Sequence, residues 1–133
     1  MYPATPVPIT VAQIELNIRR GKSAEAISLC DEVVSRFNRA FAYILRARTF
    51  ASLGRAEEAE KDFEHAAIIE PNNIETWIAR SDFYRSANQF DKAVASIRTA
   101  MSIAPDNLSV QKRAISLFLA YDNRNTVHEE GND

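Results

Sequence analysis

The chain of 133 residues has few of the residues that cross-link or bend a polypeptide. It has one cysteine, so neither an internal disulfide nor a Cys-x-x-Cys metal site can form. Three glycines and five prolines leave little material for long loops. No apolar run reaches the ~18 residues that a membrane span needs, and the N-terminus lacks the features of a secretory signal. We therefore expect a cytoplasmic chain that has no membrane partner.

The charge of the chain is nearly balanced, with a net charge of -2 and a pI near 5.7. Nucleic-acid binding needs clustered lysine and arginine, whereas here bases and acids alternate along the sequence. We therefore expect no nucleic-acid partner. A composition of 46% hydrophobic and 26% charged residues is typical of one domain that folds without a metal or cofactor.

The sequence repeats itself in register, with a period of about 34 residues that also separates Pro71 from Pro105. A fixed period of this size is typical of helix pairs that stack on their neighbours. Small residues at matching positions let the helices approach closely, while large ones fill the space between them. The matched pairs, each at the same separation as the two prolines, are Tyr43 and Trp77, Ala47 and Ser81, Phe50 and Tyr84, Gly54 and Asn88, Ala59 and Ala93, Phe63 and Ile97, and Ala66 and Ala100.

These positions follow the pattern W-x2-L-G-x2-Y, then A-x3-F, then P, and the chain resembles the tetratricopeptide repeat family. Arg46 and Arg80 stand where that family has leucine. A weaker copy lies upstream, at a separation one position shorter than the later period, and it consists of Gly21, Ala26, Cys30 and Val33.

The sequence thus predicts an all-α fold, an α-solenoid of three tetratricopeptide-type helix-turn-helix repeats with a C-terminal capping helix. The repeat domain is expected over residues 8–121, after an extended proline-rich segment, 1–7, and before a disordered acidic tail, 122–133. The repeats are expected at about residues 7–38, 40–71 and 74–105. The helices are expected at about residues 8–20, 23–36, 39–53, 56–69, 73–87, 90–103 and 107–121.

Catalytic chemistry is not indicated. The sequence has no glycine-rich phosphate loop, no Gly-x-Ser-x-Gly and no His-Glu-x-x-His motif. His65 and His128 have no cysteine near them, which argues against a metal site. Cys30 occupies the slot of Phe63 and Ile97, which predicts a buried free thiol. We expect no enzyme, and no catalytic, cofactor-binding or metal-binding residue.

The resemblance implies that the first helix of each pair lines a concave groove for an extended peptide or a partner's helix. In this chain an apolar strip there would be flanked by basic residues able to hold carboxylates. Alternatively, the apolar residues complete the core between adjacent pairs. The expected groove residues are Val11, Glu15, Arg19, Phe41, Ile44, Arg48, Ile78, Asp82, Arg85 and Lys112.

One subclass of the family grips the C-terminal carboxylate of heat-shock chaperones with two lysines, two asparagines and an arginine. The matching positions here hold Val11, Glu15, Leu45, Glu75 and Ala79. The resemblance therefore does not extend to that clamp.

The closing helix is apolar over an arc of roughly 200°, which is wider than one neighbouring helix covers. We expect an interface at Leu117, Leu119 and Tyr121, either in a homodimer or with another partner. The alternative is that these residues pack against the helix of residues 90–103.

The expected function is that of a non-enzymatic interaction scaffold or adaptor, which binds a peptide or helical segment of a partner protein in its groove. A dedicated small chaperone of this repeat family, for a secreted or aggregation-prone client, is the alternative. A third class is a regulatory or catalytic protein whose active partner is a separate chain. A repeat scaffold fixes the shape of a groove but does not name its ligand.

Overall fold

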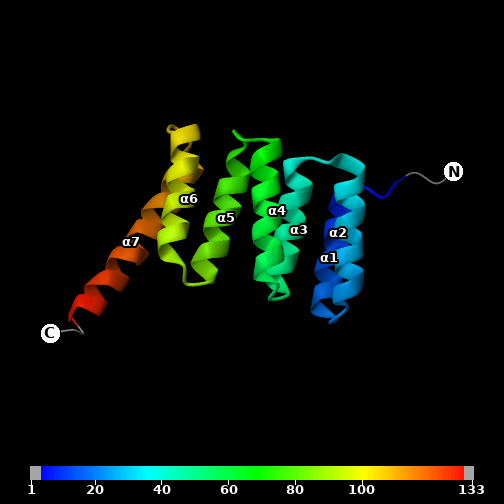
Figure 1. The fold of residues 1–133 in the computed structure, drawn as a ribbon, viewed down its shortest axis with the longest axis horizontal. Coiled ribbons are helices and arrows are strands. Elements are labelled where there is room, and N and C mark those ends of the chain that lie inside the picture. Colours follow the sequence, from blue (N-terminus) through cyan, green and yellow to red (C-terminus); the bar gives the residue numbers. More distant parts are fainter. Residues whose placement is uncertain (1–3, 131–133) are drawn as a thin grey trace. The chain divides into compact units, whose positions relative to one another are not determined.

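The computed structural model describes the backbone of residues 4–130 and the side chains of residues 4–123 (Figure 1). Within these residues the chain forms seven α-helices and no strand. They are α1 (Val7–Arg19), α2 (Ser23–Phe37), α3 (Ala40–Ser52), α4 (Ala56–Ile69), α5 (Ile74–Ser86), α6 (Phe90–Ile103) and α7 (Leu108–Glu130). Their ends lie within about one residue of the predicted ones, except at the end of α7.

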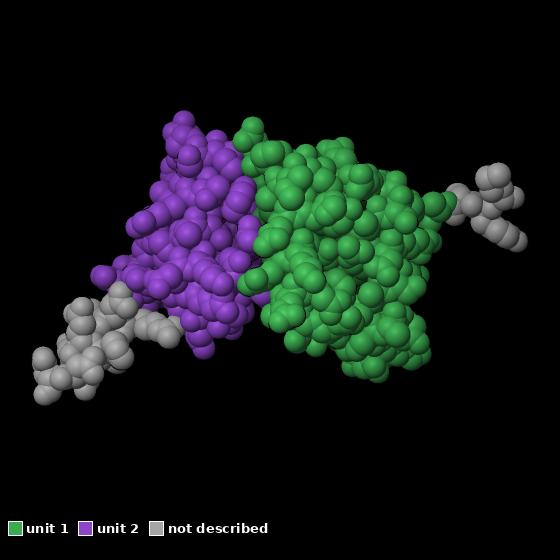
Figure 2. Space-filling model, in the orientation of Figure 1, with its two compact units in different colours: residues 1–76 green, residues 77–133 purple. Residues whose placement is uncertain are grey.

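The chain divides into two compact units, residues 1–76 and 77–133, which Figure 2 shows in different colours. Unit 1 contains α1 to α4 and the first turn of α5. In it α1 packs on α2, α2 on α3, and α3 on α4. Unit 2 contains the rest of α5, with α6 and α7, and α6 packs on α7.

The turns between the helices of each pair use the same backbone conformation. Gly21, Gly54 and Asn88 have positive φ angles of 73°, 76° and 59°. Glycine adopts this region without steric strain, and asparagine tolerates it better than most residues. A Cβ at Gly54 would meet no atom within 4 Å, so the conformation, and not a lack of space, favours glycine there.

Asparagines that follow the two prolines cap the helices that begin there. The Oδ1 of Asn73 accepts a hydrogen bond of 3.0 Å from the backbone N–H of Glu75. The Oδ1 of Asn107 accepts one of 3.1 Å from the backbone N–H of Val110. Each bond satisfies a donor that the first turn of a helix leaves unpaired.

The start of α3 is held by a carboxylate from the end of α4. Glu70 accepts a hydrogen bond of 2.6 Å from the backbone N–H of Ala40 and two bonds, of 3.1 and 3.2 Å, from the guanidinium of Arg39. The bonds from Arg39 first, and then that from Ala40, lower the pKa of Glu70. Their contribution to stability is therefore present above the ordinary pKa of glutamate and is lost as the pH falls through the lowered value.

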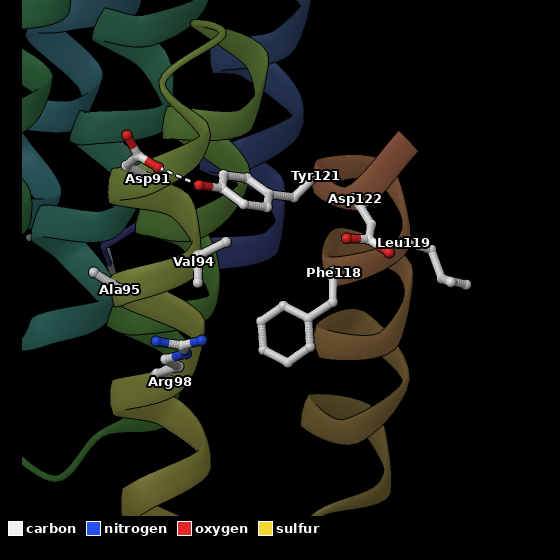
Figure 3. A pocket seen from close by; sticks show the side chains of 8 residues that line it. All are labelled: Asp91, Val94, Ala95, Arg98, Phe118, Leu119, Tyr121 and Asp122. Atoms are coloured by element: carbon white, nitrogen blue, oxygen red, sulfur yellow. Dashed lines mark hydrogen bonds between the residues drawn. The ribbon is translucent and has the colours of Figure 1, made fainter. Parts of the chain in front are cut away.

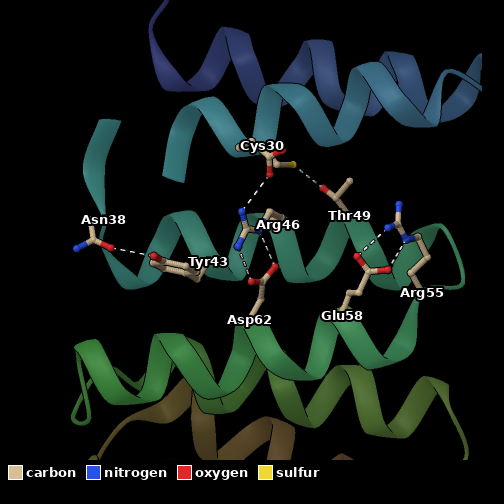
Figure 4. A network of polar contacts seen from close by, with 9 residues as sticks. Cys30, Asn38, Tyr43, Arg46, Thr49, Arg55, Glu58 and Asp62 are labelled. Atoms are coloured by element: carbon tan, nitrogen blue, oxygen red, sulfur yellow. Dashed lines mark hydrogen bonds and ion pairs between the residues drawn. The ribbon is translucent and has the colours of Figure 1, made fainter. Parts of the chain in front are cut away.

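Arg46 replaces the leucine of the repeat pattern and joins three helices of unit 1 (Figure 4). From α3 it donates two hydrogen bonds of 2.9 Å to Asp62 on α4, and one of 3.0 Å to Asp31 on α2. Asp62 is only 5% exposed, and the two hydrogen bonds from Arg46 compensate for the burial of its carboxylate. The hydrogen bonds to Asp62 raise the pKa of the Arg46 guanidinium, which stays charged.

Cys30 is fully buried in unit 1, beside Ile14 and Ala26. Its Sγ donates a hydrogen bond of 3.3 Å to the Oγ1 of Thr49 (Figure 4). Burial raises the pKa of the Cys30 thiol above its ordinary value, and that hydrogen bond lowers it by a smaller amount. The prediction of a free, buried cysteine is confirmed.

Helix α7 continues to Glu130, which corrects the predicted end at residue 121 and the predicted disorder of residues 122–130. No proline or glycine lies between Asp122 and Glu130. Extending an existing helix is far easier than starting one, so a polar segment without a breaker can continue it.

Residues 131–133 of the predicted tail, and residues 1–3 of the predicted N-terminal segment, lie outside the described residues. Before α1, Pro6 is extended, at φ -58° and ψ 143°.

Arg46→Leu should lower the free energy of unfolding by about 3 kcal/mol or more, although it introduces the residue of the repeat pattern, because Asp62 would stay buried without a partner. The double variant Arg46→Leu, Asp62→Leu should recover most of this loss. Urea denaturation followed by circular dichroism measures both. Arg55→Leu is the control, because Arg55 pairs with Glu58 on the surface, and it should change stability by less than about 1 kcal/mol. Equal losses in the two single variants would contradict the assigned role of Arg46.

Cys30 in the folded chain should react with a thiol reagent at pH 8 at least about a thousandfold more slowly than in the unfolded chain, because reaction requires local opening and ionisation. Absorbance at a fixed concentration of Ellman's reagent, with and without guanidinium chloride, measures the ratio. Because the pKa of Cys30 is raised in the folded chain, its contribution to stability is complete below the ordinary pKa of a thiol and is lost as the pH rises through the raised value. Fast labelling of the native chain would show that the thiol is accessible.

Candidate functional site

Helices α1 and α3 of unit 1 line an apolar hollow of about 310 Å³, here called the α1–α3 hollow. Ile44 is its most buried lining residue, at 5% exposed, while Phe41 is 41% exposed. The residues that line it are Val7, Val11, Phe41, Ile44, Leu45, Arg48 and Glu75. A partly solvent-exposed apolar concavity of this kind is a common feature of binding sites.

The spacing of the lining residues follows from helix geometry. Val7 and Val11 lie one turn apart on α1, and Phe41, Ile44 and Arg48 follow one face of α3 at intervals of three and four. The ring of Phe41 also contacts Phe37 at the end of α2, with ring centroids 5.1 Å apart. The hollow is therefore built on two helices that the core of unit 1 holds in place.

Two opposite charges accompany the apolar lining. Arg48 and Glu75 both line the hollow, and neither is buried. Arg48 forms no ion pair with the part of the chain whose side chains are described, so its guanidinium donors are open to a ligand. An arginine in this state can bind a carboxylate through two parallel hydrogen bonds.

The structure brings four of the expected groove residues together in this hollow, namely Val11, Phe41, Ile44 and Arg48. Glu15 and Arg19 are exposed on α1 but lie outside its lining. The predicted groove set lacks Val7, Leu45 and Glu75, which also line the hollow. The sequence could have predicted Val7, because it lies one helical turn before Val11 and so on the same face.

In unit 2 the expected groove residues lie in different surroundings. Asp82 accepts a hydrogen bond of 2.7 Å from Arg113 on α7, so its carboxylate already has a partner. Ile78 is only 5% exposed and is not among the residues that line the α1–α3 hollow, which fits the alternative that it completes the core. Lys112 is exposed on α7.

Asp82 and Arg85 line a second hollow, of about 210 Å³, with Ser81, Arg113, Ser116 and Leu117. That the expected residues form one continuous groove stays a prediction.

A third hollow, of about 450 Å³, lies between α6 and α7 (Figure 3). The hydroxyl of Tyr121 donates a hydrogen bond of 2.8 Å to Asp91, and the guanidinium of Arg98 lies 5.8 Å from the ring centre of Phe118. These contacts attach α7 to α6 in unit 2. The hollow is lined by Asp91, Val94, Ala95, Arg98, Phe118, Leu119, Tyr121 and Asp122.

The structure corrects the expected interface on the closing helix. Leu117 is 2% exposed and belongs to the core, and Tyr121 is half-buried and bonded to α6. Of the three expected residues, only Leu119, at 60% exposed, presents its side chain to solvent. Leu108 and Ile115, at 62% and 59%, are exposed as well, and the prediction omitted both.

No group of three histidine, cysteine, aspartate or glutamate side chains that could hold a metal ion occurs among the described residues. Over the same part of the chain, no helix combines the length and the apolar character that a membrane span requires.

Comparison with known proteins identifies the family. The tetratricopeptide repeat pattern matches residues 42–73 and 74–107, which contain most of α3 and all of α4 to α6. The chain belongs to the tetratricopeptide repeat family. Its predicted fold class, an all-α repeat fold of the α-solenoid class, is thereby confirmed.

One curated protein and two solved structures illustrate what this chain is similar to. Mouse (Mus musculus) sperm-associated antigen 1 is 29% identical over 96 residues, which are 72% of this chain and 10% of that protein. The chain thus spans a tenth of the length of this curated relative. TTC0263, a thermophilic tetratricopeptide protein of Thermus thermophilus, superposes with a TM-score of 0.71 at 25% identity, over 83% of this chain and 59% of that one. The first tetratricopeptide domain of Spaghetti (RPAP3) was solved with the HSP90 peptide SRMEEVD. It superposes with a TM-score of 0.65 at 15% identity, over 86% of this chain and 94% of that one.

Proposed function

We propose that this tetratricopeptide chain is a protein-interaction module that binds a partner's segment by seating an apolar side chain in the α1–α3 hollow. The observation that carries this proposal is the hollow itself, where five apolar side chains meet two oppositely charged residues. Its volume of about 310 Å³ lies at the lower end of ligand pockets, which span roughly 300–1,000 Å³. A hollow of this size suits one or two side chains of a peptide.

The charges at the hollow define the class of segment further. Arg48 favours a carboxylate, because its donors are not used within the described part of the chain. Glu75 favours a backbone N–H or a basic group and disfavours a second carboxylate beside it. The ligand that fits best is therefore a segment with a large apolar residue and an acidic residue next to it.

A related domain supports protein binding in general, since the RPAP3 domain was solved with an HSP90 peptide. The ligand proposed for this chain is different in chemistry. Val11, Leu45 and Glu75 line the hollow, and the family resemblance matches them to positions where the carboxylate-gripping subclass has clamp residues. Two apolar side chains and a carboxylate cannot replace a basic clamp, so we propose that an apolar side chain, and not a chain-terminal carboxylate, occupies this place.

Several finer expectations from the sequence stay predictions. They are the absence of catalysis, the role of adaptor, the cytoplasmic location and self-association through the last helix. A dedicated chaperone for one client is the alternative function. It would be favoured by a single stoichiometric client, whereas an adaptor would bind several partners that share the apolar–acidic motif.

Phage display of random twelve-residue peptides on the intact chain tests the proposal. The selected peptides should share a large apolar residue with an adjacent aspartate or glutamate. Arg48→Glu and Val11→Asp should each weaken binding of such a peptide about tenfold or more, which corresponds to about 1.4 kcal/mol for one well-placed contact. Isothermal titration calorimetry with a selected peptide measures the change.

Lys61→Glu is the matched control, because it reverses an exposed charge on α4, away from the lining. It should leave the affinity unchanged, and circular dichroism should show that all three variants are folded. Peptides without a shared apolar–acidic motif, or equal effects of Lys61→Glu and Arg48→Glu, would remove the α1–α3 hollow as the binding site.

A further inference from the structure

Helix α7 carries an exposed stripe on the side that the rest of unit 2 does not cover. Five residues follow one another at intervals of four, three, four and three, the spacing by which two helices pack along a seam. Three of them are apolar and about 60% exposed, namely Leu108, Ile115 and Leu119. This α7 outer stripe consists of Leu108, Lys112, Ile115, Leu119 and Asp122.

A second stripe on the opposite face of α7 is already buried. Val110, Ala114 and Leu117 are at most 2% exposed, and Tyr121, the next residue in the same spacing, is bonded to Asp91. At about 100° per residue, the centres of the two stripes lie roughly 150° apart on the helix. Figure 3 shows Phe118 and Tyr121 directed toward α6, and Leu119 directed away from it. A helix on the surface of a domain usually has one apolar face, which packs on the core. Helix α7 has two, and unit 2 covers only one of them.

The register of the repeats shows that the outer stripe does not fit a further helix of the repeat type. Ile115 lies one full period after Ser81, which is 4% exposed and donates a hydrogen bond of 3.1 Å to the backbone carbonyl of Ala93 on α6. That close approach of two helices requires small residues at the contact. An isoleucine in this slot keeps a following helix at a greater distance, so the occupant packs differently from α6 on α5.

The charges of the stripe are complementary to those of the same stripe in a second, antiparallel copy. When two α7 helices lie antiparallel and centred level with residue 117, Ile115 of one copy faces Leu119 of the other. In the same arrangement Lys112 faces Asp122. Two-fold symmetry forms each contact twice, which gives two apolar pairs and two pairs of opposite charge. A parallel arrangement would instead place like charges opposite each other.

We propose that a second copy of this chain occupies the α7 outer stripe, in an antiparallel helix pair with two-fold symmetry. The stripe is about 21 Å long, at 1.5 Å per residue, so the pair buries less than the roughly 1,200 Å² of a standard interface. We therefore expect a weak dimer, with a dissociation constant of about 10–100 µM. The α1–α3 hollow belongs to unit 1 and the stripe to unit 2, so peptide binding and dimer formation can fail separately.

Sedimentation equilibrium of the full chain from about 5 to 500 µM tests the proposal, and the wild type should change from monomer to dimer over this range. Leu119→Glu should stay monomeric and folded, since this side chain is mostly exposed. Ile68→Glu is the matched control: Ile68 is 76% exposed on α4, and its replacement should not alter the dimer.

A charge exchange tests the antiparallel register. Lys112→Asp and Asp122→Lys should each raise the dissociation constant about tenfold, because each turns both attractive pairs into repulsive ones. The double variant should return to within about threefold of the wild-type value. A wild type that is monomeric at about 500 µM, a dimer that Leu119→Glu does not disrupt, or a double variant no better than the single ones would overturn the proposal.

Discussion

The two helices of a pair approach each other closely at a small residue, and this contact governs how the helices pack. In unit 1 the small residue is Ala47, which is fully buried, and in unit 2 it is Ser81. The hydrogen bond from Ser81 to the backbone of Ala93 shows how closely α5 and α6 approach. Larger rings one turn further on, Phe50 and Tyr84, fill the space that remains and are also buried.

This contact fixes one face of each first helix and leaves its other faces available for recognition. In unit 1, α3 uses a free face for the apolar wall of the α1–α3 hollow, with Arg48 at its edge. In unit 2, α7 has no following helix among the described residues and presents the outer stripe instead. A chain that binds a segment at the hollow and a second copy at α7 would present two hollows, and a partner with two motifs would then bind more tightly than one motif predicts.

The sequence predicted the helices well because local signals agree with the period: left-handed turn residues such as Gly54, and asparagine caps such as Asn73. It predicted burial of Cys30 because the repeat assigns that slot to the core. It could not tell Leu117 from Leu119, since a wide apolar arc does not show which side a neighbour covers. It also could not foresee the role of Arg46, because its partner Asp62 is 16 residues away on another helix.

Methyl NMR can show whether recognition takes place in the α1–α3 hollow. Isoleucine, leucine and valine methyl spectra of the full chain would be recorded with and without a peptide that the wild type selects. If recognition takes place there, the peptide should cause shifts, and intermolecular nuclear Overhauser effects, at Val7, Val11, Ile44 and Leu45, while Ile115 stays unchanged. Shifts confined to the methyl groups of α7, with those four residues unmoved, would contradict it.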